Sequence, residues 1–153
     1  MAKRTDALFF GPHFEQCAAL CYRHAADGVQ VLILTSRESG RWIIPKGWPM
    51  DGKKPHQVAA QEALEEAGVR GKAKKKPFGY FTYLKELDSG QRVPCLVQVH
   101  LLKVESMEED FPEKDQRTLE WVSCLEAALR VKEPELKGLF LLLRRKLDGA
   151  PRK

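Results

Sequence analysis

The sequence of 153 residues predicts one α/β domain, and three observations support this fold class. Apolar runs rich in β-branched residues are separated by glycine-containing turns, which is typical of antiparallel strand pairs. A stretch bounded by Pro55 and Gly68 carries the end signals of a helix. Near the end of the chain, apolar residues recur at helical spacing. A length of this order fits one domain, so we expect residues 1–153 to form a single unit.

The first third of the chain predicts a strand pair, a short strand and a loop. Residues 16–22 and 29–35 are apolar runs separated by a turn signal at 26–28, which favours a buried hairpin. Residues 42–44 predict a short strand. Residues 45–55 contain three prolines and two glycines, so we expect a loop of defined shape there.

The middle of the chain predicts a helix and a second hairpin. Proline suits the first turn of a helix and glycine suits the position after its end, so we expect the helix to span 55–67. The basic stretch 72–76 is interpreted as a solvated surface. Residues 78–87 and 93–104 are rich in β-branched and aromatic residues and flank a turn at 88–90, which predicts an antiparallel hairpin.

The last part of the chain predicts an acidic loop, a strand and two helices. Residues 105–115 form the acidic loop, and 118–122 predict a short strand. Ser123 and Glu126 have the spacing of a capping box, which begins a short helix. A final amphipathic helix is expected from residue 133 to about 148, because its apolar residues recur at helical spacing.

The composition excludes several classes of protein. With 43% hydrophobic and 31% charged residues, the chain is of the globular rather than the disordered type. The longest apolar run is too short to span a membrane, and no secretory signal is seen, so we expect a cytoplasmic protein without membrane contact. The four cysteines lack zinc-ligand spacing and are interpreted as reduced and buried. Residues 1–10 and 148–153 are expected to be flexible. A net charge of +5 is compatible with a polyanionic partner.

Three glutamates on the predicted helix are candidate metal ligands. At about 100° per residue, Glu62, Glu65 and Glu66 fall in one sector opposite the apolar residues, so we expect them to point away from the core. Like charges at this spacing destabilise a helix, and a bound cation would reverse that cost. Oxygen ligands favour Mg²⁺, with Mn²⁺ as the alternative, over Zn²⁺. An isolated acidic face is usually only solvated, but a loop containing Gly47 precedes this one at a fixed distance.

Residues 47–69 resemble the signature of the Nudix hydrolase family, a loop–helix–loop motif. The matching positions are Gly47, Glu62, Ala63, Glu65, Glu66, Gly68 and Val69. Two positions depart from the signature: Lys53 stands in place of a glutamate and Gln61 in place of an arginine. In the family the signature glutamate and arginine are understood to form an ion pair that braces the loop. Because both partners of that pair are replaced here, neither is left as an unpaired charge. We therefore still expect an active enzyme.

The resemblance extends from about residue 16 to residue 140, and it implies a fold and an activity. Several segments are similar to the diphosphoinositol and dinucleoside polyphosphate phosphohydrolase branch of the family: 17–23, 36–37, 41–45 and 120–121. The implied fold is an α/β/α sandwich with a mixed β-sheet. The implied activity is divalent-metal-dependent pyrophosphohydrolysis of a dinucleoside polyphosphate or a diphosphoinositol polyphosphate.

Other functions stay open at this point. Removal of a 5′-pyrophosphate from RNA and cleavage of ADP-ribose are enzymatic alternatives. A non-catalytic Nudix module that binds nucleotide or RNA is a third, and the altered Lys53 and Gln61 give it weight. Both a monomer and a homodimer fit the sequence.

The resemblance also suggests roles for the acidic residues. We expect Glu62 and Glu66, one turn apart, to be direct metal ligands. Glu65 would complete the set or orient the attacking water, and the backbone carbonyl of Gly47 would supply a further ligand. The general base is left open, and the acidic loop offers three more candidates, which are Glu109, Asp110 and Glu113.

A polyphosphate substrate needs cations, because Arg and Lys are the side chains that bind phosphate. The candidates are Arg23, Arg37, Lys46, Lys53 and Arg117. Trp48 either flanks a base or an inositol ring or packs within its loop.

Overall fold

Two long strands form the centre of a mixed sheet in the computed structural model, which describes residues 14–147. Strand β1 (Phe14–Ala25) and strand β7 (Arg92–Met107) run parallel, with Phe14 opposite Cys95 and Tyr22 opposite Lys103. The other strand pairs are antiparallel.

The remaining described strands flank this pair. They are β2 (Gly28–Thr35), β3 (Trp42–Ile43), β4 (Lys46–Gly47), β5 (Val69–Ala73), β6 (Gly79–Glu86) and β8 (Leu119–Ser123). Strands β2 and β4 pair with β1, strands β5 and β6 pair with β7, and strands β3 and β8 pair with β2. The two predicted hairpins are therefore confirmed as β1–β2 and β6–β7.

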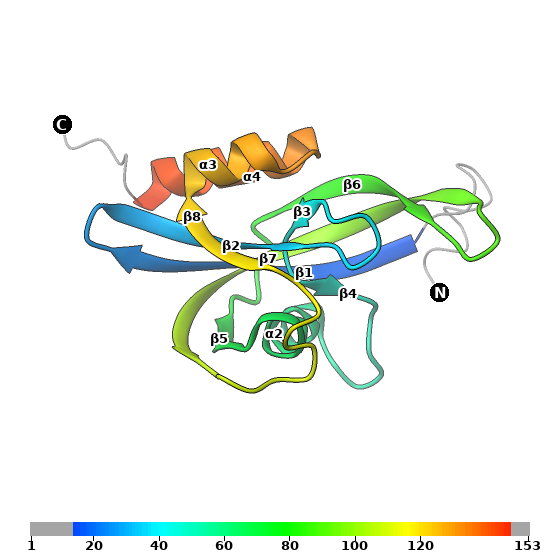
Figure 1. Ribbon diagram of the computed structural model, residues 1–153, viewed down its shortest axis with the longest axis horizontal. Helices are drawn as coiled ribbons and strands as arrows, with labels where there is room; N and C mark the ends of the chain where they lie inside the picture. Colours follow the sequence, from blue (N-terminus) through cyan, green and yellow to red (C-terminus); the bar gives the residue numbers. More distant parts are fainter. Residues whose placement is uncertain (1–13, 148–153) are drawn as a thin grey trace.

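Helices cover both faces of the sheet (Figure 1). Helix α2 (Pro55–Ala67) lies on one face, whereas α3 (Cys124–Arg130) and α4 (Pro134–Leu147) lie on the other. The prediction of an α/β/α sandwich with a mixed β-sheet is confirmed. Among the helices of residues 14–147, none is long and apolar enough to cross a membrane.

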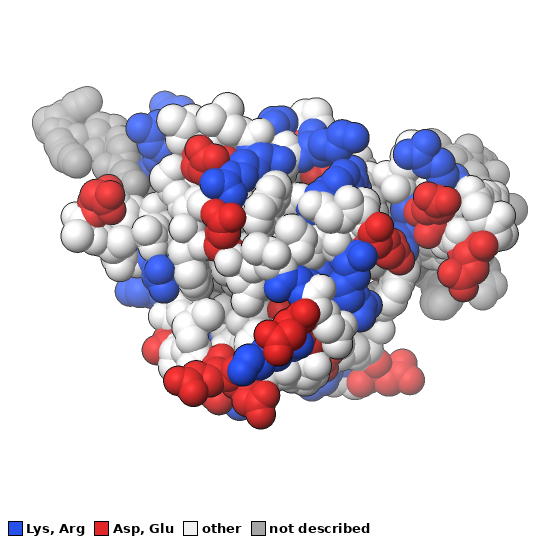
Figure 2. Space-filling view, viewed as in Figure 1, with Lys and Arg blue, Asp and Glu red and all other residues white. Residues whose placement is uncertain are grey.

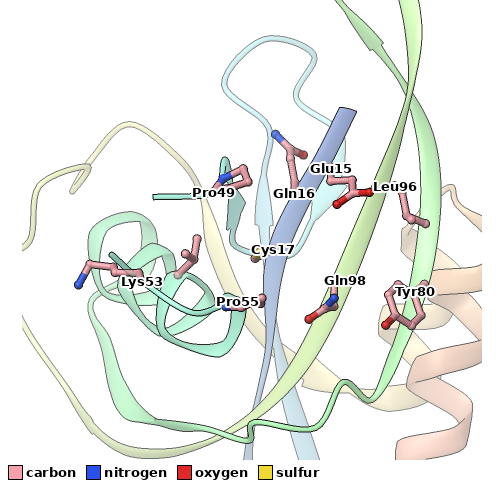
Figure 3. Close-up of a pocket in the computed structure, with 10 residues that line it drawn as sticks. Glu15, Gln16, Cys17, Pro49, Lys53, Pro55, Tyr80, Leu96 and Gln98 are labelled. Carbon is pink, nitrogen blue, oxygen red and sulfur yellow. The ribbon is translucent and has the colours of Figure 1, made fainter. Parts of the chain in front are cut away.

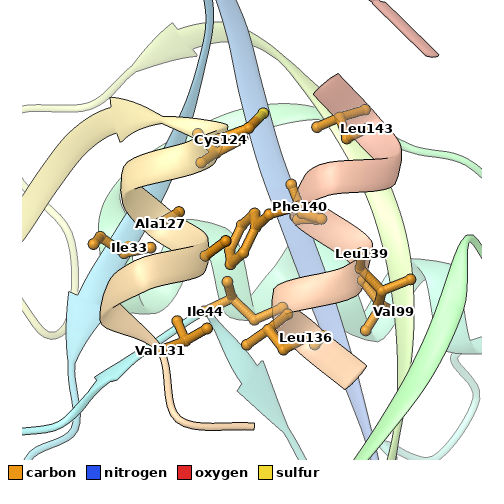
Figure 4. Packing of buried hydrophobic residues seen from close by; sticks show 14 of the residues in the cluster. Ile33, Ile44, Val99, Cys124, Ala127, Val131, Leu136, Leu139, Phe140 and Leu143 are labelled. Carbon is orange, nitrogen blue, oxygen red and sulfur yellow. The ribbon is translucent and has the colours of Figure 1, made fainter. Parts of the chain in front are cut away.

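Alternation along the strands divides the apolar side chains between two cores. In β1, Leu20 belongs to the core under α3 and α4, whereas its neighbours Ala19 and Cys21 belong to the core under α2. This is the period-two pattern of a strand buried on both faces. Figure 4 shows Phe140 reaching from α4 towards α3, and this ring is fully buried. Complete burial of such a side chain contributes about 1.5–3 kcal/mol.

The ends of α2 follow the local signals. The Gln57 side chain accepts a hydrogen bond from the Lys54 backbone N–H at 2.8 Å, which satisfies one free donor at the start of the helix. At the other end, Gly68 adopts a φ of 70°, the left-handed conformation that glycine tolerates. A Cβ at Gly68 would also collide with the Phe111 ring and the Glu108 carbonyl. The predicted helix bounds are thus confirmed.

Three segments differ from the expectation. The loop 45–55 contains strand β4, because its prolines lie outside the two residues that pair with β1. The lysines of the basic stretch 72–76 are exposed, as expected, but its first two residues belong to β5, an edge strand that pairs with β7. Strand β7 continues to Met107, into the segment expected to be a loop.

Two further expectations concern the cysteines and the chain ends. All four cysteines are free and buried, as predicted. The segments expected to be flexible, 1–10 and 148–153, lie outside the described residues.

Candidate active site

Helix α2 and strand β4 bring Glu62 against Gly47. A Cβ at position 47 would overlap the Glu62 carboxylate, so only glycine allows this approach. Glu62 and Glu66 line a cleft rather than the apolar core, as expected, but they are only 8% and 5% exposed. Helical spacing placed them opposite the apolar residues of α2, but it could not show that β4 covers that side.

The two buried carboxyl groups perturb each other. Burial, followed by a hydrogen bond with Glu62, raises the pKa of Glu66 to about 8. Burial also raises the pKa of Glu62, and the hydrogen bond with Glu66 opposes that shift. Two carboxyl groups buried side by side favour holding one proton between them, because both cannot ionise there without a cation.

Arg117 is the cation that faces this pair. Its side chain is 7% exposed, and Nη2 lies 3.7 Å from Glu66 Oε2 and 3.1 Å from Glu113 Oε1. Nη1 donates to the Thr35 carbonyl at 3.0 Å. Arg117 therefore lies in the predicted region, and its guanidinium is bound to protein groups.

Glu65 is oriented differently from its two neighbours. The Gln61 side chain donates to Glu65 Oε2 at 2.6 Å, and the Glu65 backbone carbonyl accepts from the Glu113 N–H at 2.9 Å. Within residues 14–147, no group of three or more His, Cys, Asp or Glu side chains is arranged as a metal-ligand set. The residue that replaces the signature arginine thus holds the third glutamate.

The donor chemistry of the remaining pair fits a hard divalent cation. Glu66 Oε1 is buried and has no hydrogen-bond partner within residues 14–147. Glu62 and Glu66 offer carboxylate oxygens on one side of α2, and the backbone of Gly47 lies against them. Oxygen donors of this kind suit Mg²⁺ or Mn²⁺.

A cleft of about 1150 Å³ opens over these residues. It is lined by Glu62, Glu65 and Glu66 together with many cations. Of the predicted cations, Arg37, Lys46 and Arg117 line it, and Arg41, Lys85 and Arg92 join them without having been predicted. Figure 2 shows basic side chains gathered between the α3–α4 layer and α2, with carboxylates among them. This charge pattern suits a ligand with several phosphates.

Lys46 lies deep in the cleft beside Gly47. Its ammonium lies 4.7 Å from the centre of the Tyr83 ring, a cation–π arrangement. Burial lowers its pKa, and the charge of Glu66 opposes that shift. The Tyr83 hydroxyl in turn donates to Gln16 at 2.7 Å. Lys46 is thus held in place by β4 and an aromatic ring.

Two predicted substrate cations lie outside the cleft lining. The Arg23 guanidinium lies 4.1 Å from the centre of the Trp121 ring, and its Nε donates to Gln30. Lys53 lies at a separate pocket of about 440 Å³, where Figure 3 shows its ammonium pointing away from Cys17. The sequence places Arg23 at a strand end and Lys53 in a loop, but these positions do not predict in which direction either side chain points.

The acidic loop contributes one residue to the cleft. Glu113 lines it, whereas Glu109 and Asp110 are exposed and do not. Glu113 is fixed by two hydrogen bonds from Arg117, at 3.1 and 3.2 Å. Trp48 lines the cleft as well and is 43% exposed.

A buried carboxylate on the opposite wall was missed by sequence reasoning. Glu133 directly precedes α4, lines the cleft and is 7% exposed. In the sequence it was only part of a helix start. The one available signal was a charged residue next to the apolar face of that helix.

Comparison with known proteins agrees with this geometry. A family model of the Nudix domain matches residues 15–143. The chain therefore belongs to the Nudix family, and the resemblance found in residues 47–69 is confirmed.

Two named proteins of this family are similar to the chain over much of its length. Human diphosphoinositol polyphosphate phosphohydrolase 3-alpha is 29% identical over 139 residues, covering 90% of this chain and 80% of that protein. The mitochondrial Nudix hydrolase 13 of Arabidopsis thaliana is 31% identical over 104 residues, covering 65% of this chain but only 52% of that protein. The chain thus spans about half the length of the plant relative.

A solved structure shares the fold. The crystal structure of C. elegans Ap4A hydrolase matches with a TM-score of 0.61 at 17% identity, covering 86% of this chain and 96% of that one. These proteins are named as hydrolases, in agreement with the predicted class of a polyphosphate pyrophosphohydrolase.

Proposed function

We propose that this protein is a divalent-metal-dependent pyrophosphohydrolase that cleaves a phosphoanhydride in a nucleoside or inositol polyphosphate. One observation carries the proposal: two buried carboxyl groups, Glu62 and Glu66, meet Gly47 at the base of a cleft lined with cations. Burying like charges together is costly unless a cation joins them.

Glu62, Glu66 and the Gly47 backbone would hold the metal, which we take to be Mg²⁺ with Mn²⁺ as the alternative. Glu65 would join them through Oε1, while Gln61 keeps its hydrogen bond to Oε2. A bound divalent ion lowers the pKa of water and neutralises charge on phosphate oxygens.

The chain's own side chains have separate tasks in this proposal. Arg37 and Lys46 bind phosphate oxygens from the cleft wall. Glu113 is the general base that accepts the proton of the attacking water, because it lines the cleft and Arg117 keeps it oriented. Arg117 acts by holding Glu66 and Glu113 rather than by touching the substrate.

The names of the relatives support the substrate class. Diphosphoinositol polyphosphates and Ap4A, the compounds in those names, both contain phosphoanhydride bonds, so we carry that class over to this chain. We also propose that the protein is located in the cytoplasm. Two plant relatives are named as mitochondrial. Cell fractionation tests the proposal, and recovery of the protein in mitochondria would contradict it.

The first experiment compares the protein with its Glu66→Gln variant. Both are incubated with Mg²⁺ and diadenosine polyphosphates, inositol pyrophosphates, ADP-ribose and triphosphorylated RNA, and products are resolved by mass. Metal-dependent turnover that falls by several orders of magnitude in the variant is expected. Equal turnover by both proteins would overturn the metal assignment, and ligand binding without turnover would favour a non-catalytic module. Chromatography of the same sample separates monomer from homodimer.

A further inference from the structure

Glu133 is a buried carboxylate, 7% exposed, with one oxygen that lacks a hydrogen-bond donor. Among the described residues 14–147, no group donates to its Oε1, which is itself buried. Its Oε2 lies 3.8 Å from Arg41 Nη1, which is longer than a hydrogen bond. Buried carboxylates in proteins are normally hydrogen-bonded, so an unused acceptor of this kind calls for a ligand.

Glu133 belongs to the same cleft as the carboxylates of α2 but lies on its other wall. It directly precedes α4, on the face of the sheet opposite α2. Lys46 lines the cleft together with both of them, and the charges of Glu66 and Glu133 both act on its ammonium. The cleft therefore has an acidic end at α2, cations along its length and a second, buried acid at α4.

This second acid distinguishes between classes of polyphosphate. A phosphate group carries only acceptor oxygens at neutral pH, so a ligand phosphorylated over its whole surface would bring negative charge against Glu133. A nucleoside offers hydroxyl groups on its ribose and amino groups on its base, and both are donors. Donors to a carboxylate form short, charge-assisted hydrogen bonds.

We propose that Glu133 accepts a hydrogen bond from the nucleoside part of the substrate, and that the protein therefore prefers nucleoside polyphosphates to diphosphoinositol polyphosphates. This inference rests on the proposed function and narrows its substrate class. Glu133 acts here as a specificity residue, and the metal-binding end of the cleft is unchanged by it.

Binding measurements test the proposal without relying on turnover. The Glu133→Gln variant keeps the size of the side chain and removes its charge. Its affinity for two non-hydrolysable probes is measured by calorimetry in Mg²⁺ buffer. The first probe is methylene-bridged diadenosine tetraphosphate, which carries nucleosides. The second is bismethylene triphosphate, which has neither ribose hydroxyls nor base amino groups. We expect the diadenosine probe to bind roughly tenfold more weakly than to the parent protein, because the amide oxygen of glutamine still accepts a hydrogen bond but no longer carries the charge that strengthens it. The triphosphate probe is expected to bind equally well or more tightly.

Glu38→Gln is the matched control for charge. Glu38 is an exposed carboxylate that lines the same cleft. The substitution changes net charge by the same amount, but at an exposed rather than a buried carboxylate. An equal loss of diadenosine affinity in Glu38→Gln and Glu133→Gln would overturn the proposal.

A second test leaves the protein unchanged and therefore does not depend on the folding of a variant. The same diadenosine probe is prepared without its ribose 2′- and 3′-hydroxyls or without its adenine amino groups. Weaker binding of one analogue identifies the donor, and the Glu133→Gln variant should discriminate against that analogue less than the parent protein does.

The outcomes separate this inference from the proposed function. Undiminished binding of both analogues to the parent protein, or equal losses for both probes in Glu133→Gln, would overturn the role of Glu133 and leave the hydrolase intact. Failure of every polyphosphate to bind would overturn both.

Discussion

The guanidinium of Arg117 lies 3.7 Å from the carboxyl group of Glu66, and both side chains are more than nine-tenths buried. The same guanidinium holds Glu113, so one cation links α2 to the acidic loop. Removing one partner of a buried pair leaves an uncompensated charge in a medium that solvates it poorly.

Replacement of this arginine is expected to destabilise the fold. For Arg117→Met we expect the free energy of unfolding to fall by about 3 kcal/mol or more, because Glu113 loses the cation that binds it and the buried carboxyl pair of α2 loses the positive charge that faces it. Urea denaturation with EDTA measures this, and added Mg²⁺ should restore part of the loss. Arg117→Lys keeps the positive charge but lacks the planar guanidinium that can bind two groups at once. Its free energy of unfolding should lie between those of the parent protein and Arg117→Met. A loss below about 0.5 kcal/mol, typical of surface changes, would contradict the prediction.

The raised pKa of Glu66 predicts a pH-dependent stability in metal-free protein. The folded state holds the Glu66 proton up to about pH 8, whereas an unfolded glutamate loses it near pH 4.3. Between these values the folded state binds more protons, so the free energy of unfolding falls as pH rises. Thermal unfolding in EDTA from pH 5 to 9 should show this decline.

Glu66→Gln should flatten that decline, since the titrating group is gone. Glu65→Gln is the control, because Glu65 is on the same helix and less buried. The same decline in all three proteins would assign the effect to another group.

The contact between Gly47 and Glu62 predicts a site-specific effect of one methyl group. In Gly47→Ala the new Cβ must displace the Glu62 carboxylate, the mobile end of its side chain. We expect turnover to fall by about 100-fold, the cost of a displacement near 1 Å in an active site. The melting temperature should change little. Kinetics under saturating Mg²⁺ checks the first expectation and calorimetry the second.

Gly138→Ala is the matched control for this substitution. Gly138 lies within α4, and a Cβ there meets no atom of the described part of the chain within 4 Å. Alanine should therefore stabilise the protein by about 0.5–1 kcal/mol and leave turnover unchanged. Equal losses of activity in both variants would rule out a role for the Gly47 contact.

The departures from the family signature can be reversed together. In the double variant Lys53→Glu and Gln61→Arg, we expect turnover to be retained, because Lys53 lies at the smaller pocket and not in the cleft. A glutamate there also interacts favourably with the start of α2. Steady-state kinetics with a diadenosine polyphosphate measures turnover. The single variant Lys53→Gln is the control, because it removes the lysine charge without creating the glutamate–arginine ion pair. A collapse in polyphosphate affinity would instead make Lys53 a substrate ligand.

Local signals explain why most of the fold could be predicted. The bounds of α2 follow from Pro55 and Gly68, whose backbone preferences need no tertiary information. The start of α3 is equally local, since Ser123 accepts from the Glu126 N–H at 3.0 Å. Strand β5 was not predicted, because its residues carry no clear strand pattern of their own. Its extended conformation depends on pairing with β7.

The site was predictable where residues lie on one element or in one motif. Gly47, Glu62 and Glu66 were found by their spacing, and the structure brings them together. Arg23 failed to reach the cleft because the direction of a side chain at a strand end depends on its neighbours, here Trp121. Glu133 could not be found from spacing, since its place in the cleft depends on how α4 packs on the sheet.

The parallel pairing of β1 with β7 also determines when the protein can fold during synthesis. Phe14 pairs with Cys95, on the order of 80 residues later, so the centre of the sheet closes a long loop and should form slowly. The segment that carries Gly47, Glu62 and Glu66 leaves the ribosome before β7 does. Until β7 arrives, these acids and the apolar face of β1 have no completed sheet to cover them, and chaperones have that interval in which to bind the nascent chain.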